Sequence, residues 1–155
     1  LLELTRHTPR DFLRLLKYIQ DSSQGSRSTN KLTRQDIVLG AKTYSLEYFL
    51  PEIKDELTGY CDQNDIDKLV RVIGMLRKRE FNFSELSSAS EKNGIDKENL
   101  QTIAAHLFDC SAIGNIQNRG EGSYYTFRYR NRHSSINFNE KIILHRGLWK
   151  ALNLI

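Results

Sequence analysis

One arginine of this chain stands where a helix is expected to begin, and its charge does not suit that place. In the run Thr8, Pro9, Arg10 and Asp11, Thr8 is a favourable N-cap and Pro9 a favourable first helical residue. A cation in the first turn opposes the helix dipole, so helix stability does not explain Arg10. The backbone N–H groups at a helix start attract anions such as phosphate, and Arg10 would strengthen that attraction. The alternatives are that Arg10 pairs with Asp11 or Glu3, or points into solvent.

A second set of arginines surrounds an expected β-hairpin in the last third of the chain. Residues 113–116 and 124–130 flank a turn at 118–122, so both are expected to be strands. Alternation along 124–130 places Arg128 and Arg130 on one face and three aromatic residues on the other. The candidate nucleic-acid or partner-binding residues of this region are Arg119, Arg128, Arg130 and Arg132.

The charge of the chain is concentrated in the same region. The net charge is +4, and residues 111–155 contain seven basic and two acidic side chains. A row of arginines on a solvent-facing strand suits contact with nucleic-acid phosphates. The same row would also suit an acidic protein surface, or would simply keep an exposed sheet edge soluble. All three interpretations remain open at this point.

The other reactive residue types form no catalytic or metal-binding pattern. The four histidines are scattered, and Cys61 and Cys110 have neither CxxC spacing nor a matched pair of histidines. Asp65 and Asp67 lie on different sides of an expected helix, so they do not form a shared carboxylate site. We therefore expect no catalytic residue, no metal site and no enzymatic activity in this chain alone.

The sequence also bears on where the protein resides. No apolar run approaches the ~18–20 residues that a membrane-spanning helix needs, so no membrane partner is expected. With no disulfide framework and no signal peptide, the expected location is the cytoplasm, with both cysteines reduced.

The elements that must position these residues fall into two parts. Residues 1–60 predict three helices, separated by a polar loop near 22–30 and by Pro51. From residue 62 to 130 the expected order is helix, short strand, helix, helix and β-hairpin, which is the order of a winged helix-turn-helix. A further strand is expected at 142–144 and a helical turn at 147–152. The predicted fold is therefore mainly α, with a helical segment before a winged helix-turn-helix domain and a small β-hairpin as the wing.

The third helix of that domain is poorly suited to the DNA major groove, where such helices usually bind. Asp96, Glu98 and Asp109 outweigh Lys97, so the helix would add repulsion between the phosphate rows. Gln101 is the one residue there that could bond an adenine edge. Nucleic-acid binding through the wing is the remaining mode.

Both ends of the chain resemble a known family. Thr5, Pro9, Arg10 and Asp11, followed by a leucine-rich run, resemble the start of the lid helices that follow the nucleotide-binding core of bacterial P-loop ATPases of the AAA-like and STAND-like kind. The ending at 145–152 is similar to that of the winged-helix-like domain that often comes next. The resemblance implies a lid-like segment at 1–60 and a winged-helix-like domain at 61–155. It also implies that Arg10 senses nucleotide, while ATP and Mg²⁺ are held upstream and no cofactor is held by this chain.

The first hypothesis is therefore a C-terminal regulatory or interaction module of a P-loop ATPase. It would couple nucleotide state to a macromolecular partner and would not be catalytic by itself. Its expected partners are the upstream ATPase core and either DNA, RNA or an acidic protein surface. The alternatives are a nucleic-acid-binding winged-helix module with a basic wing, and a structural or oligomerisation domain.

Overall fold

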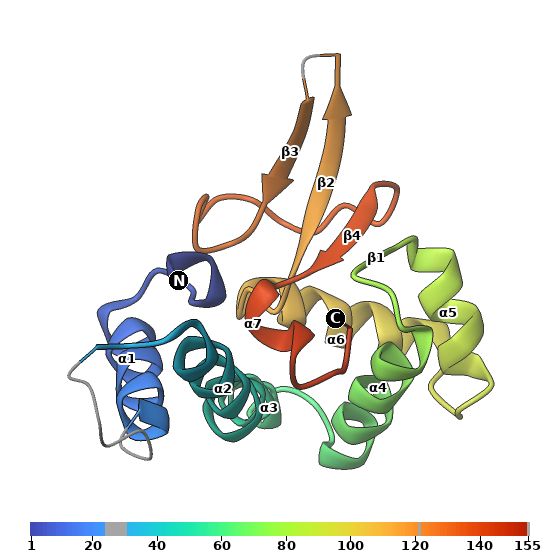
Figure 1. Cartoon of the computed structure of the whole chain (residues 1–155). Coiled ribbons are helices and arrows are strands. Elements are labelled where there is room, and N and C mark those ends of the chain that lie inside the picture. The colour runs from blue at the N-terminus through green and yellow to red at the C-terminus, as the bar shows by residue number, and fades with distance from the viewer. Residues whose placement is uncertain (24–30, 121, 155) are drawn as a thin grey trace.

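A computed structural model describes the chain except for residues 24–30, 121 and 155 (Figure 1). Helices make up most of the described residues: a short η1 (Leu2–Leu4), α1 (Pro9–Ser23), α2 (Arg34–Tyr44), a π-helical turn η2 (Ser45–Phe49), α3 (Leu50–Thr58), α4 (Gln63–Leu76), α5 (Phe83–Glu91), α6 (Lys97–Asp109) and a short α7 (Arg146–Trp149). The strands are β1 (Glu80–Phe81), β2 (Ile113–Arg119), β3 (Gly122–Thr126) and β4 (Lys141–Leu144). They form one antiparallel sheet in the order β1-β4-β2-β3.

Side-chain caps fix the starts of the helices, as the sequence predicts. The hydroxyl of Thr8 accepts a hydrogen bond from the Asp11 N–H at 3.1 Å, in the first turn of α1. Thr33 and Asp36 form a reciprocal capping box at the start of α2. The carboxylates of Asp62 and Asp96 accept backbone N–H bonds at the starts of α4 and α6. These caps use neighbouring residues only, which is why the sequence alone reveals them.

The helical run from α2 to α3 is continuous, although it contains a proline. Pro51 has no N–H to donate, and its ring would clash with the carbonyl of the preceding turn. The chain widens there into η2 instead of ending, so α2, η2 and α3 follow one another without a break. Pro51 therefore does not end the helical run, and a π turn lies just before it; the alternative, that Pro51 bends the run, stays a prediction.

The first 60 residues and the rest of the chain share one hydrophobic core. Leu15 and Ile19 from α1 lie in the same buried cluster as Phe49 of η2, Leu107 of α6 and Leu148 of α7. Polar bonds join the same parts of the chain. The Ser45 hydroxyl donates to the carbonyl of Gly147 and accepts from the N–H of Ala151 at 3.0 Å. Residues 1–60 and the rest of the described chain therefore pack directly against each other.

The sheet differs from the prediction in one respect that matters for the candidate site. The further strand expected at 142–144 is present as β4, and it lies between β1 and β2. The strand expected at 124–130, however, ends at Thr126, so Arg128 and Arg130 lie in a turn and not on a strand. Phe127 is buried with Ile116 and Ile143. Its carbonyl accepts hydrogen bonds from the N–H groups of Arg130 and Asn131 at 3.0 and 3.1 Å, and these bonds close the turn.

The hairpin of β2 and β3 extends away from the helical body (Figure 1). β3 is its outer strand, because β2 pairs with β3 on one side and with β4 on the other. The loop from Phe127 to Glu140 returns from the hairpin to β4 and passes close to the N-terminal segment, where Tyr129 and His7 have ring centroids 4.9 Å apart. The arginines of this loop are thereby placed beside α1.

A glycine at the contact between α1 and α2 offers a test of this packing. A Cβ on Gly40 would lie 2.5 Å from the Cα of Ile19, so the two helices would have to move apart. We expect Gly40→Ala to lower the free energy of unfolding by about 1–3 kcal/mol, measured by urea denaturation. Gly59→Ala is the matched control, because a Cβ there would meet no atom within 4 Å. A Gly40→Ala variant as stable as the Gly59→Ala variant would contradict the close contact.

Candidate functional site

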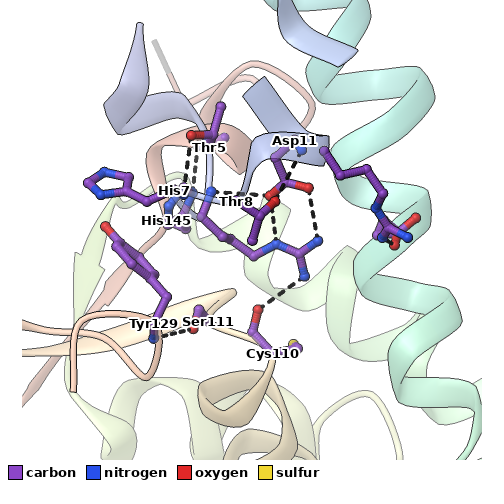
Figure 2. A network of polar contacts seen from close by, with 12 residues as sticks. Thr5, His7, Thr8, Asp11, Cys110, Ser111, Tyr129 and His145 are labelled. Carbon is purple, nitrogen blue, oxygen red and sulfur yellow. Dashed lines mark hydrogen bonds and ion pairs between the residues drawn. The ribbon is translucent and has the colours of Figure 1, made fainter. Parts of the chain in front are cut away.

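An ion pair buried between the N-terminal segment and the helices supports the candidate site (Figure 2). The Arg6 side chain is 9% exposed and that of Asp11 is fully buried. Arg6 binds both carboxylate oxygens of Asp11, through Nε at 3.0 Å and Nη2 at 3.3 Å. Its Nη1 donates to Glu56 of α3 at 2.5 Å and to the carbonyl of Cys110, after α6, at 3.5 Å. One guanidinium therefore joins α1, α3 and the end of α6.

The pair keeps both of its members charged. Burial acts to lower the pKa of Arg6, but hydrogen bonds and the charges of Asp11 and Glu56 outweigh it and raise that pKa. Burial likewise acts to raise the pKa of Asp11, and the bonds and charge of Arg6, with the hydroxyl of Tyr48, outweigh it and lower that pKa. Tyr48 donates to Asp11 at 3.0 Å. The result is a charged, fully bonded network.

Beside this pair lies an arginine-rich hollow of about 380 Å³. Its lining residues are Arg6, Thr8, Arg10, Glu56, Asp109, Cys110, Ser111, Arg128, Tyr129 and Arg132. Arg10 comes from the first turn of α1, whereas Arg128 and Arg132 come from the loop after β3. The lining holds four arginines and two carboxylates, and two further carboxylates, Asp11 and Glu52, pair with Arg6 and Arg10 from just outside it. An anionic ligand is therefore favoured where it can replace one of these carboxylates.

Two of the arginines in the hollow, Arg10 and Arg128, make exposed ion pairs. Arg10, whose side chain is 63% exposed, pairs with Glu52 of α3. Neither expected partner of Arg10 is the observed one, because Asp11 binds Arg6 and Glu3 binds Arg146. Arg128 approaches Asp109 at 3.7 Å. Exposed pairs of this kind are weak, so an anion could displace the carboxylates.

The structure brings some of the predicted binding residues together and leaves others apart. Arg10, Arg128 and Arg132 share the hollow. Arg130 lines a different hollow, and Gln101 lies on α6 in a third one beside α5. Arg119 is the last residue of β2, and its side chain lies outside the described structure. The group around Arg10 is therefore smaller than the sequence suggests, and it includes Arg6, which the sequence analysis did not single out.

His145 is a buried, neutral side chain that lines the same hollow as Arg130. Its Nδ1 accepts a hydrogen bond from the Gly147 N–H at 3.1 Å, which caps α7. Its ring stacks on Phe49 at 4.9 Å between centroids and meets Tyr129 edge-on at 5.8 Å. Burial, reinforced by the charge of Arg6, lowers the pKa of His145 to about 3. This histidine is positioned to cap and pack, and it stays uncharged at neutral pH.

The described residues present neither a metal site nor a reactive thiol. No group of three or more histidine, cysteine, aspartate or glutamate side chains in them is placed to hold a metal ion. Cys61 and Cys110 are free thiols, and burial raises the pKa of Cys110 to about 12. A thiol with so high a pKa is a poor nucleophile at neutral pH. Nor does any helix in the described part of the chain have the length and apolar character to cross a membrane.

Comparisons with family models, with curated proteins and with solved structures found no match to this chain.

The buried ion pair can be tested by removing its cation. Arg6→Met leaves Asp11 buried without a counter-charge, so we expect the free energy of unfolding to fall by about 3–5 kcal/mol. Arg10→Met, which breaks only an exposed pair, should change stability little. Urea denaturation of the two variants beside the parent would measure both effects. An equal fall in the free energy of unfolding of the two variants would mean that the buried pair stabilises the protein no more than the exposed pair does.

His145 should make stability depend on pH. Its pKa is lower in the folded than in the unfolded state, so between about pH 6.5 and 3 the unfolded state binds more protons. Stability should therefore fall as the pH falls, with His145 accounting for about 2 kcal/mol between pH 7 and pH 5. In His145→Asn, which keeps a good capping side chain, that part of the pH dependence should disappear. Unfolding free energies at pH 7 and pH 5 would show whether the two proteins differ in slope.

Proposed function

We propose that this chain is a non-catalytic regulatory module of a P-loop ATPase, and that Arg10 contacts the phosphates of a nucleotide held by the ATPase core. The observation that carries the proposal is the shared hollow, in which Arg10 meets Arg128 and Arg132 from the far end of the sequence. Residues 1–60 would be the lid-like part and residues 61–155 the winged-helix-like part. The order α4, β1, α5, α6 and the β2–β3 hairpin supports the second assignment.

The hollow suits the terminal phosphates of a nucleotide. A guanidinium binds phosphate oxygens through two parallel hydrogen bonds, and such charge-assisted bonds are stronger than neutral ones. The side chain of Arg10 is largely exposed, so it can leave its partner Glu52 and bind another anion without disturbing the core. Thr8 and Ser111 add hydroxyl groups to the same lining. Arg6, held by Asp11 and Glu56, fixes the shape of the site and does not have to move.

Exchange of partners would also couple the site to the rest of the module. Arg10 links α1 to α3 through Glu52, and Arg128 links the loop after β3 to α6 through Asp109. A phosphate that binds both arginines competes with both links. The bound and unbound states then differ in how α1 and the loop are held against α3 and α6, and a partner protein or nucleic acid can read this difference. We place this activity in the cytoplasm, in keeping with the two free thiols.

The test uses the full-length protein in which this chain would follow the ATPase core. We expect Arg10→Ala to weaken ATP binding about 10-fold or more, as the loss of one charge-assisted hydrogen bond implies. The matched control is Arg14→Ala, one turn further along α1 and outside the lining of the hollow. Binding would be measured by isothermal titration calorimetry, alongside ATP turnover. If Arg10→Ala and Arg14→Ala bind ATP as the parent does, Arg10 does not sense nucleotide.

A further inference from the structure

A second hollow, of about 370 Å³, lies on the other side of the loop after β3. It is bounded by β1, β3, the loop and α7. The residues that give it its character are Arg79, Tyr125, Tyr129, Arg130 and Trp149. Planar aromatic rings and planar guanidinium groups thus line the same concave surface. Arg79, Tyr125 and Trp149 are not among the binding residues expected from the sequence.

The aromatic rings and the cations of this hollow are already arranged in pairs. The Arg79 guanidinium lies 4.2 Å from the ring centre of Trp149. Arg130 lies 5.6 Å from the ring centre of Tyr129, and its Nε donates to the Tyr129 hydroxyl at 3.1 Å. The indole N–H of Trp149 donates to the carbonyl of Leu144 at 3.0 Å, which holds that ring in place. The surface is therefore pre-organised to stack on flat groups.

The carboxylates at the rim do not cancel the positive charge. Glu3 pairs with Arg146, and Glu80 pairs with Lys141 at 3.7 Å. Among the described residues, neither Arg79 nor Arg130 forms an ion pair with a carboxylate. The Nε of Arg79 donates to the carbonyl of Leu154 at 3.0 Å, which leaves its charge without a carboxylate partner, so both guanidinium groups can attract an anionic ligand.

The loop connects this hollow with the first one. Tyr129 lines both, while Arg128 and Arg132 line the first and Arg130 lines the second. Arginines thus lie on both sides of Tyr129, next to aromatic rings. This arrangement matches a polymer in which flat bases alternate with phosphates. An acidic peptide would use the arginines but would leave the rings without a stacking partner. A duplex would keep its bases stacked on one another, away from the rings.

We propose that the hollow between β3 and α7 binds single-stranded nucleic acid, with a base stacked on Tyr125 and phosphates bound by Arg79 and Arg130, next to the Trp149 ring that Arg79 and Arg146 cover. The site is separate from Arg10 and does not depend on the ATPase proposal. Tyr125 is 44% exposed, so its ring has a surface to offer without any rearrangement of the core.

Trp149 provides a direct probe, because it is the only tryptophan of the chain. We expect an oligothymidylate of ~12 nucleotides to quench its fluorescence, with an affinity that falls as salt increases. Tyr125→Ala and Arg130→Ala should each weaken binding about 10-fold, as the loss of one stacked base or one phosphate contact implies. Tyr124→Ala is the matched control, since this equally exposed neighbour points to the opposite face of β3 and should leave the affinity unchanged.

Three results would overturn the proposal. One is an absence of quenching by the oligonucleotide at low salt. Another is equal loss of affinity in Tyr124→Ala and Tyr125→Ala, which would remove the site from this hollow. The third is that polyglutamate or a DNA duplex quenches Trp149 as strongly as the single strand, which would assign the surface to an acidic protein or to duplex shape. Arg10→Ala should bind the oligonucleotide within about twofold of the parent, so failure of the ATPase proposal would be seen separately.

Discussion

The buried ion pair between Arg6 and Asp11 is the interaction on which the candidate site depends. Asp11 belongs to the first turn of α1, and Arg6 reaches from it to α3 and to the end of α6. A charge buried in this way is stable only while its partner is present, because transfer of an unpaired ion from water to the protein interior is very unfavourable. Asp11 cannot move away from Arg6 without leaving a buried charge unpaired. This ion pair therefore fixes the position of the α1 start, and with it that of Arg10.

Local sequence features predicted much of the fold. The caps at Thr8, Thr33 and Asp62 involve neighbouring residues, and the order of helices and strands follows from hydrophobic periodicity. The end of β3 was not predictable in this way, because the alternation of aromatic residues continues through Tyr129. After Thr126 the chain turns, because the carbonyl of Phe127 accepts hydrogen bonds from the N–H groups of Arg130 and Asn131 at 3.0 and 3.1 Å. A pattern of period two cannot record such a contact.

The candidate site was predictable only in part, for a similar reason. The unfavourable place of Arg10 in its helix pointed to an unusual role, and the arginines of the last third pointed to a basic surface. That Arg10, Arg128 and Arg132 line one hollow depends on the return of the loop from β3 to the N-terminal segment. Arg6 gave no signal at all, since a spacing of five residues to Asp11 matches no regular side-chain pairing within a helix.

The contact between the two ends of the described chain has a mechanical consequence. Gly147 lies so close to the carbonyl of Leu4 that a Cβ would approach it to 2.7 Å, and Glu3 holds Arg146 beside it. These contacts hold η1, near the start of the chain, against α7, near its end. The first residues of the chain are thus held at two places, by η1 against α7 and by Arg6 against α3 and the end of α6. The two hollows adjoin at Tyr129, whose ring packs against His7 of the same N-terminal segment, so the anchoring of that segment bears on both.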